Sequence, residues 1–296
     1  MALFGSAALG STLEVERHAP GAVVVGTDGS EFSDAVVGYA ATLAAARSRE
    51  LVIVYGAGSA SRRVLDEDTE ERAQFLLEHA ERVARRTASH AAVSTDLAAC
   101  SPAKALLQLS RDAHLVVVGK ARSERLLALG STAMSVATHA ACPVIVVRTQ
   151  PGVDQVRRVG PVIVGVDLSS GNELAIAAAF AEASARRAAL LAVHACRDSA
   201  ANRADPLDDE AALAQRIAVW EERYPDVPVT RRVYTDGPRQ RLAELSRSAQ
   251  LVVVGNRGLG GFAGLLLGST SSAVLARAGC PVMVVRSESP DRDVNS

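Results

Sequence analysis

The feature that most constrains this sequence is that a long part of it occurs twice in modified form. Residues 113–120 read AHLVVVGK, and residues 249–256 read AQLVVVGN. In the same way, THAACPVIVVR at 138–148 returns as ARAGCPVMVVR at 276–286. Self-similarity over so long a period indicates one structural unit present in two copies. A chain of 296 residues is also long enough for about two domains of ordinary size.

The two copies set the expected domain bounds. We predict a first domain over residues 20–149 and a second domain over residues 160–287. Residues 149–159 between them are polar and contain proline and glycine, as linkers commonly do. We expect residues 1–20 and 287–296 to be loose extensions at the two ends of the chain.

Within each copy, short apolar runs alternate with helical patterns. Runs such as LVVV at 251–254 leave no polar face, which is typical of strands buried on both sides. Strands that alternate with helices in this way indicate a parallel sheet covered on both faces. We therefore predict an α/β protein of two tandem doubly wound, Rossmann-like domains, each with a five-stranded parallel sheet flanked by helices. The strands expected in the first copy are 22–26, 51–55, 92–98, 115–119 and 144–148.

Composition and charge exclude several classes of function. The formal net charge is −1, which predicts no strong electrostatic attraction to nucleic acid or to an anionic membrane. No apolar run approaches the ~18 residues of a transmembrane helix. The segment Met1–Gly10 lacks the basic start and the long apolar core of a signal peptide. We therefore expect a cytoplasmic protein without a membrane or nucleic-acid partner.

The cysteines and histidines do not form a disulfide or metal-binding pattern. The cysteines lack CxxC spacing, and in a reducing cytoplasm buried free thiols are the expectation. The histidines are not spaced with acids or cysteines as metal ligands are, so we predict no metal held by side chains. A GxSxG nucleophile elbow is absent. The residues concerned are Cys100, Cys142, Cys196, Cys280, His18, His79, His90, His114, His139 and His194.

The stretch 251–286 carries the residues that point to a ligand. A buried-strand run leads into Gly255 and Gly258, and after nine further residues Gly268 and Ser269 open a helical segment. Residues without a β-carbon let backbone N–H groups approach an anion closely. A helix N-terminus adds unpaired N–H donors and a partial positive charge. We expect a phosphate chain here, with Ser269 as the helix N-cap; two glycine turns around an ordinary loop are the alternative.

Further residues of the second copy are expected at the same edge of the sheet, because open parallel sheets bind ligands outside the carboxyl ends of their strands. Asp167 ends the first strand, and it either accepts hydrogen bonds from adenine or ribose or caps the following helix. Ala195 follows the second strand and leaves room for a base. Arg257 is either a counter-charge for phosphates or a solvated loop arginine. With the hydroxyls of Ser269 and Thr270, this set fits a mononucleotide.

These segments resemble the universal stress protein family. The pattern GNRG-x9-GS at 255–269 matches the G-x2-G-x9-G-(S/T) motif of its nucleotide-binding members, and VGVDLS at 164–169 and CPVMVVR at 280–286 support the match. The resemblance is to the tandem-domain members and covers nearly everything from Pro20 to Arg286. It implies domains similar to those of the adenine nucleotide alpha hydrolases, an ATP site, and a fifth strand that pairs domains. Mg²⁺ would be carried only on the bound ATP. The nucleotide contacts that the resemblance implies are Val166, Asp167, Ala195, Gly255, Arg257, Gly258, Gly268, Ser269 and Thr270.

The first copy departs from this motif. Arg122 stands where the second glycine belongs, and the loop from Gly119 to Gly130 is two residues shorter than the motif requires. A shorter loop with a bulky residue should crowd a triphosphate, although Lys120 and Arg122 add positive charge. We therefore predict a weak or empty first site and an occupied second site. The first-copy residues that match the site are Thr27, Asp28, Gly119, Gly130, Ser131 and Thr132.

Three functions fit the sequence. The first is an ATP-binding regulatory protein that acts as a nucleotide-dependent switch in a stress or dormancy response. The second is a slow ATPase or phosphotransferase, but a GxxxxGK(S/T) motif is absent and no lysine follows Lys120. The third is a structural protein whose nucleotide sites are vestigial. We expect the first of these, with at most very slow ATP hydrolysis, and so not an enzyme.

The apolar runs Val144–Val147 and Val282–Val285 end the two copies. Each would be an exposed sheet edge if it had no neighbour on one side. We predict that the two runs pair with each other, because this would explain why the copies are fused in one chain. We also expect the whole chain to form a homodimer.

Overall fold

The structure is a computed structural model that describes residues 18, 20–58, 67–120, 130–148, 156–195, 206–257 and 267–286. Most of the expected N-terminal extension and the whole C-terminal tail lie outside these residues. So do part of the linker and the central parts of both glycine loops, at 121–129 and 258–266.

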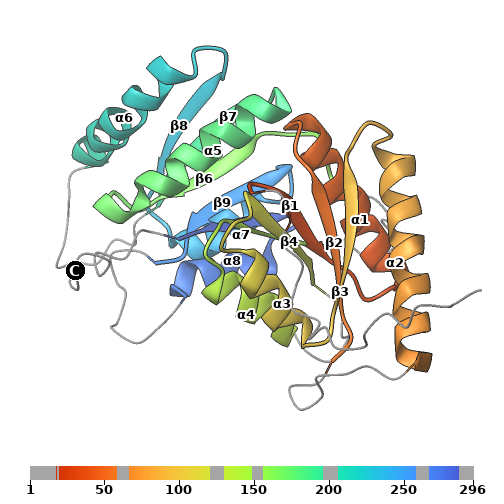
Figure 1. The fold of residues 1–296 in the computed structure, drawn as a ribbon. Helices are drawn as coiled ribbons and strands as arrows, with labels where there is room; N and C mark the ends of the chain where they lie inside the picture. Colours follow the sequence, from red (N-terminus) through yellow and green to blue (C-terminus); the bar gives the residue numbers. More distant parts are fainter. Residues whose placement is uncertain are drawn as a thin grey trace, which may run out of the picture.

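In the first half of the chain, strands and helices alternate without exception among the described residues (Figure 1). Each of the five predicted strands is present, and its ends agree with the prediction to within one residue. The elements are β1 (Val23–Gly26), α1 (Glu31–Ala46), β2 (Leu51–Gly56), α2 (Glu67–Thr87), β3 (Val93–Ala98), α3 (Pro102–Leu109), β4 (Leu115–Gly119), α4 (Ser131–His139) and β5 (Val144–Val147).

The second half repeats this order and adds one short 3-10 turn before its first helix. The elements are β6 (Val162–Val166), η1 (Ser170–Asn172), α5 (Glu173–Arg186), β7 (Leu190–Ala195), α6 (Pro206–Arg223), β8 (Val229–Tyr234), α7 (Pro238–Leu245), β9 (Leu251–Gly255), α8 (Ser269–Arg277) and β10 (Val282–Val285).

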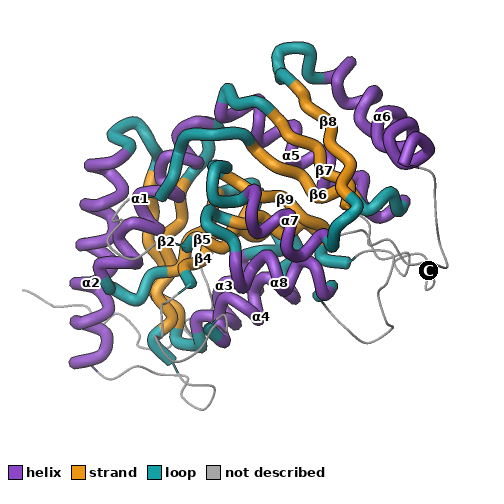
Figure 2. The backbone as a smooth tube through the Cα atoms, turned by 180° about the vertical axis from the view of Figure 1, so that it is seen from behind, coloured by secondary structure: helices purple, strands orange, loops and turns teal. Residues whose placement is uncertain are grey.

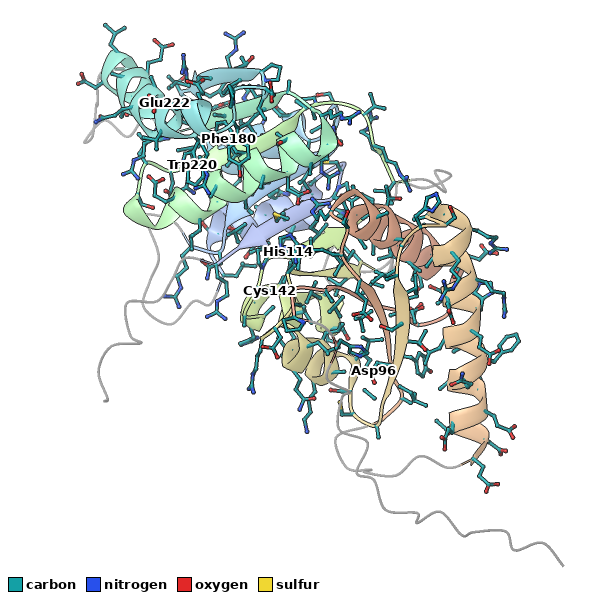
Figure 3. All side chains as sticks on the ribbon, turned by 45° about the horizontal axis from the view of Figure 1, so that its top comes forward. Asp96, His114, Cys142, Phe180, Trp220 and Glu222 are labelled. Carbon is teal, nitrogen blue, oxygen red and sulfur yellow. The ribbon has the colours of Figure 1, made fainter. Side chains whose placement is uncertain are left out.

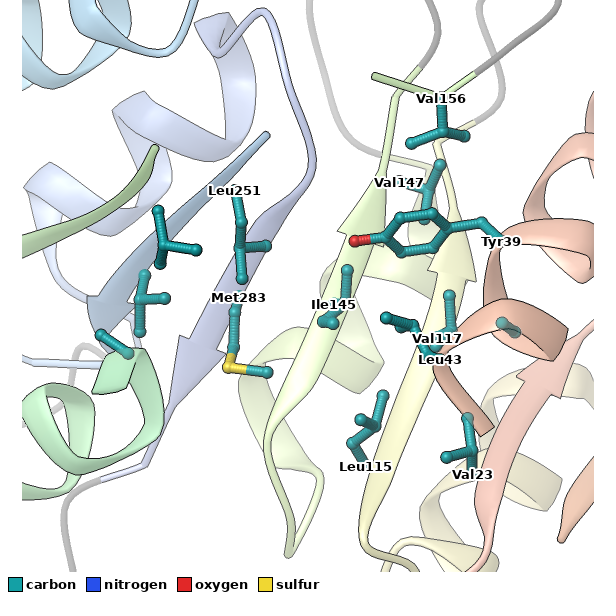
Figure 4. Packing of buried hydrophobic residues seen from close by; sticks show 14 of the residues in the cluster. Val23, Tyr39, Leu43, Leu115, Val117, Ile145, Val147, Val156, Leu251 and Met283 are labelled. Atoms are coloured by element: carbon teal, nitrogen blue, oxygen red, sulfur yellow. The ribbon is translucent and has the colours of Figure 1, made fainter. Parts of the chain in front are cut away.

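All ten strands of the described residues join in a single sheet, in the order β3-β2-β1-β4-β5-β10-β9-β6-β7-β8. Within each half the strands are parallel, as predicted. The two halves meet where β5 and β10 pair in antiparallel orientation, with Met283 opposite Ile145 (Figure 4). The prediction that the last strands pair with each other is therefore confirmed. Because these strands run in opposite directions, the carboxyl ends of the two parallel sets face opposite edges of the sheet.

Helices cover both faces of this sheet (Figure 2). Alternate residues along each strand point to opposite faces. Val23 and Val25 of β1 pack in the core under α1, α2, α5 and α6, whereas Val24 packs in the core under α3, α4, α7 and α8. Equivalent helices of the two halves thus share a face of the sheet. The fold is the predicted pair of doubly wound domains, joined through one continuous sheet.

A buried charged cluster joins the two domains on the first of these faces. Glu182 of α5 is 4% exposed and accepts hydrogen bonds from Arg47, at the end of α1, and from Arg186 Nε at 2.9 Å. Arg186 also donates to the Tyr39 hydroxyl at 2.8 Å and to Gln250 Oε1 at 3.4 Å. Arg47 and Arg186 occupy equivalent positions in the two repeats, so an arginine from each domain shares one carboxylate.

Aromatic side chains at the end of α6 pack against α5. The centroid of the Phe180 ring on α5 lies 6.3 Å from that of Trp220 on α6 (Figure 3). It lies 5.7 Å from that of Tyr224, the residue that directly follows α6. Tyr224 N donates to Trp220 O at 2.9 Å, so the last turn of α6 brings the two rings to the same side. These rings therefore pack α6 against α5.

The described cysteines are free thiols. Cys142 and Cys280 are free and buried, which confirms the expectation for these two, whereas Cys100 is free but half-buried. Cys196 lies outside the described residues. Burial raises the pKa of the Cys142 and Cys280 thiols to about 12, so both remain protonated at neutral pH.

Among the described residues, no helix combines the length and the apolar character needed to cross a membrane.

Candidate functional site

In each domain the strand order reverses beside the first strand. In the second domain the chain moves outward from β6 to β7 and β8, and then returns to β9 on the other side of β6. Open parallel sheets bind ligands at such a switch point, outside the carboxyl ends of the strands. Asp167 directly follows β6, and Gly255 is the last residue of β9. The structure therefore brings these two predicted site residues to the switch point.

The other predicted residues lie at the same edge. Val166 is the buried last residue of β6. Ala195 was predicted to follow the second strand, but it is the last residue of β7. Arg257 is exposed just beyond β9, whereas Thr270 is half-buried in the first turn of α8. Gly258 lies outside the described residues.

The start of α8 differs from the prediction in one respect that bears on anion binding. Gly268 and not Ser269 occupies the N-cap position, with φ −63° and ψ 154°, and Ser269 is the first helical residue. The prediction that Ser269 caps the helix is therefore wrong. Glycine has no side chain to accept hydrogen bonds, and among the described residues no side chain makes a cap bond at the start of α8. The N–H groups of its first turn are left for another acceptor, and an anion suits such a position.

Two hydrogen bonds tie this helix start to the end of β9, and a third ties that strand end to β10. Gly268 N donates to Asn256 O at 2.6 Å, and Ser271 Oγ donates to Gly255 O at 2.5 Å. Asn256 N in turn donates to Val285 O of β10 at 2.8 Å. Hydrogen bonds within the protein therefore fix the helix N-terminus against the switch point. Sequence reasoning missed Asn256 and Ser271, although both lie within the glycine motif and its helix.

Asp167 is engaged in its own loop. Its Oδ1 accepts hydrogen bonds from Ser169 N at 2.9 Å and from Ser169 Oγ at 2.6 Å. Asp28 binds Ser30 in the same way in the first domain, at 3.0 and 2.6 Å. Of the two roles considered from the sequence, the structure thus shows a loop contact. The role in ligand binding stays a prediction, for which the second carboxylate oxygen, Oδ2, is the available acceptor.

The two loops differ in how they begin the next helix. Ser30 is the N-cap of α1 and accepts a hydrogen bond from Ser33 N at 3.2 Å, whereas Ser169 makes no such cap bond. We expect Ser30→Ala to lower the free energy of unfolding by about 1 kcal/mol more than Ser169→Ala, because only the first removes a helix cap. Urea denaturation of both variants measures the difference, and equal effects would show that the cap of α1 adds no stability.

An arginine on α6 holds the loop that follows β6. Arg216 donates to Leu168 O at 2.8 Å, to Ser169 O at 3.0 Å and to Glu173 Oε1 at 2.9 Å. Leu168 has a φ of 61°, in the left-handed region that non-glycine residues rarely adopt. Its repeat equivalent is Gly29, with a φ of 75°. Arg216 therefore stabilises the strained backbone at Leu168, next to Asp167. No local sequence pattern indicated this contact of Arg216.

Two further buried polar residues support the end of β6. His194 Nδ1 lies 2.8 Å from Val166 O, and its Nε2 lies 3.8 Å from Asp209 Oδ2. Asn172 is 3% exposed and donates from Nδ2 to Gly165 O at 3.3 Å, while its Oδ1 is buried without a hydrogen-bond partner among the described residues. A β-carbon on Gly255 would lie 3.7 Å from Asn172 Nδ2, which places this amide between β6 and β9.

The corresponding region of the first domain is built differently. Thr27 Oγ1 and Ser33 Oγ are 2.7 Å apart and satisfy each other, where the second domain has Val166 and Asn172. Gly119 ends β4, and a β-carbon there would lie 2.8 Å from Phe32. Gly130 is the N-cap of α4, followed by Ser131 and Thr132 in the first turn. Arg122 and the rest of the shortened loop lie outside the described residues, so the expected crowding of this site stays a prediction.

Two cationic residues, Lys120 and Arg148, lie at the carboxyl ends of β4 and β5 in the first domain. Lys120 follows β4, and burial together with the charge of Arg148 lowers the pKa of the Lys120 ammonium.

Within the part of the chain that the structure describes, histidine, cysteine, aspartate and glutamate form no group of three that could hold a metal ion.

Fold and site together define the class: a tandem doubly wound α/β protein with a helix N-terminus at the switch point of each domain. The model of the family described as "Universal stress protein family" matches residues 21–148 and 159–286, which is most of the chain. The chain therefore belongs to the universal stress protein family and carries two copies of its domain.

Known proteins with the same organisation are found in mycobacteria. A universal stress protein of Mycobacterium tuberculosis is 39% identical over 292 residues, covering 89% of this chain and 96% of the relative. Among solved structures, a universal stress protein from Archaeoglobus fulgidus has a TM-score of 0.67 at 19% identity, covering 91% of this chain and 97% of that chain. A shorter universal stress protein solved in complex with cAMP is 28% identical, has a TM-score of 0.36, and covers 44% of this chain and 98% of its own.

Proposed function

We propose that this protein binds ATP in its second domain and acts as a nucleotide-dependent regulatory switch in a stress or dormancy response. The observation that carries the proposal is the start of α8. Its N-cap is a glycine without a side-chain acceptor, and hydrogen bonds from Gly268 and Ser271 fix it to the end of β9. Unpaired N–H groups at the switch point of a parallel sheet are suited to a phosphate chain.

Each neighbouring residue has a place in this proposal. The N–H groups and hydroxyls of Ser269 and Thr270 bind the phosphates, and Arg257 supplies positive charge from the exposed end of β9. Asp167 has one carboxylate oxygen, Oδ2, to accept a hydrogen bond from a ribose hydroxyl, as acidic residues at such switch points do. Ala195 at the end of β7 leaves space for the base. Mg²⁺ prefers carboxylate and phosphate oxygens and keeps several waters, so it would enter with the phosphates.

Binding without appreciable turnover is the mode that these residues favour. Phosphoryl transfer needs charge neutralisation, usually by a lysine and by an acid that holds a metal ion. The second domain contains no lysine. At a ligand concentration 100 times the dissociation constant, binding alone stabilises the liganded state by about 2.7 kcal/mol. A switch in the cytoplasm, where ATP is abundant, requires no more than this. Sustained ATP turnover by the purified protein would contradict this part of the proposal.

The test is a calorimetric titration of the purified full chain with ATP, after removal of any ligand carried over from expression. We expect one strong site per chain, because only the second copy retains the complete glycine motif. Mass spectrometry of the ligand released by denaturation should identify an adenine nucleotide. Two sites of equal affinity would contradict the asymmetry between the domains. Absence of any binding, with no released nucleotide, would contradict the proposed function and favour a structural role.

A further inference from the structure

Each domain provides an arginine that donates a hydrogen bond to a carbonyl group at the end of the other domain's last helix. Arg148 follows β5 in the first domain and donates from a terminal guanidinium nitrogen to Leu275 O, in the last turn of α8, at 3.4 Å. Arg286 follows β10 in the second domain and donates to His139 O at 3.1 Å and to Ala140 O at 3.2 Å, at the end of α4. The two arginines occupy equivalent positions in the repeat. The exchange is therefore reciprocal, and it follows from the antiparallel pairing of β5 with β10.

The helix that Arg148 contacts begins at the proposed phosphate site. Nine residues make α8 about 13 Å long at the usual helical rise. Its N-terminus lies at the carboxyl edge of the second domain's strands, beside Gly255. Its C-terminus lies near the opposite edge of the sheet, where Arg148 follows β5. One short, straight element thus spans from the nucleotide site of one domain to a charged residue of the other.

The physical chemistry of helix ends links these two positions. The last carbonyl groups of a helix have no partner within it, and a cation near them interacts favourably with the helix dipole. An anion at the N-terminus interacts favourably with the other end of the same dipole. Arg148 is half-buried, so water screens its charge less than it screens a fully exposed arginine. A residue that holds the last turn of α8 in place therefore also favours the ordered first turn that an anion requires.

We propose that Arg148 of the first domain is a positioning residue for the nucleotide site of the second domain, acting through α8. This inference rests on the proposed function, since it assumes that the second site binds ATP. It assigns to the first domain a contribution to nucleotide binding that does not require the first domain to bind nucleotide itself. It also assigns a role to the fusion of the two copies, because the arginine that donates to Leu275 O of α8 belongs to the other copy.

The experiment compares three variants of the full chain by calorimetric titration with ATP. Arg148→Ala should weaken binding about two- to fivefold, the effect of one charge at a helix end. Arg148→Lys should restore most of the affinity, because it returns a cation to the end of α8. Arg286→Ala is the matched control: it removes the equivalent contact across the same seam but acts on α4, so it should leave the affinity within the error of the wild-type value.

The control also separates the inference from a simple effect of charge. Arg286 lies at the same sheet edge as the proposed site, whereas Arg148 lies a helix length away, so charge alone predicts the larger loss for Arg286→Ala. A larger loss of ATP affinity in Arg286→Ala than in Arg148→Ala would overturn the inference. So would unchanged ATP binding by Arg148→Ala, or an Arg148→Lys variant that does not regain affinity. If the wild-type chain binds no ATP, the proposed function fails. If the wild type binds and Arg148→Ala binds equally well, only the inference fails.

Discussion

Replacing Glu182 with alanine should lower the free energy of unfolding by about 3–5 kcal/mol. Glu182 is 4% exposed and is the shared acceptor for Arg47 and Arg186. Without it, the side chains of two arginines remain buried and have lost the carboxylate that accepted their hydrogen bonds and offset part of their charge. Removing one partner of a buried ion pair is costly, because the remaining charge has been taken out of water without compensation. The hydrogen bond from Arg186 to the Tyr39 hydroxyl does not replace that charge.

Chemical denaturation followed by far-UV circular dichroism measures this effect. The matched control is Glu81→Ala, which removes an exposed ion pair with Arg85 on α2 and should change stability by about 0.5 kcal/mol or less. Glu182→Gln keeps the shape of the side chain and should fall between the two. Because the cluster links α1 with α5, we expect Glu182→Ala to destabilise both domains together. A loss no larger than that of Glu81→Ala would show that the cluster does not stabilise the domain pair.

Replacing Gly268 with aspartate should weaken ATP binding at least about 100-fold, because two negative charges ~4 Å apart repel by several kcal/mol near a protein surface. The substitution is compatible with the fold, since Gly268 has extended backbone angles and aspartate is among the best N-cap residues. Its carboxylate would accept hydrogen bonds from the N–H groups that we assign to the phosphates. The variant should therefore be as stable as the wild type without ligand, and yet lose the ligand.

The first domain offers the control for this variant. Gly130 is the equivalent N-cap of α4, and a β-carbon added there would meet no atom within 4 Å. We expect Gly130→Asp to leave the strong ATP site intact. Calorimetric titration of both variants, with thermal unfolding of the ligand-free proteins, gives the comparison. If Gly130→Asp abolishes binding and Gly268→Asp does not, the nucleotide is bound by the first domain and our assignment is wrong.

The fold was predictable from the sequence because its determinants are local and repeated. The apolar run LVVVG at Leu251–Gly255 and its copy at Leu115–Gly119 are each buried on both faces, and such runs have few alternatives to a central parallel strand. The pairing of β5 with β10 could also be inferred, since two apolar strands would otherwise be exposed edges. The repeat then fixed the number of domains without any knowledge of contacts between them.

The site could be predicted only in part, because its supporting residues come from distant segments. Arg216 and His194 reach the loop and strand end beside Asp167 from α6 and β7, and neither stands in a motif. The cap of α8 was misassigned by one residue, because serine and glycine are both acceptable at that position and the backbone angles decide between them. Glu182 had a usable signal: it is the one acidic residue among the apolar and small residues that follow Glu173 in α5.

The antiparallel seam between β5 and β10 has a consequence for assembly. Each of these strands has a hydrogen-bonded neighbour on both sides, so the backbone of neither is open to a second chain. A homodimer that extended the sheet would have to use β3 or β8, and β8 carries exposed Arg231 and Arg232, which discourage strand addition. Association of the two repeats is intramolecular, with an effective concentration that the covalent connection sets. Dilution of the protein therefore leaves this pairing unchanged, whereas it would separate the same two domains on independent chains.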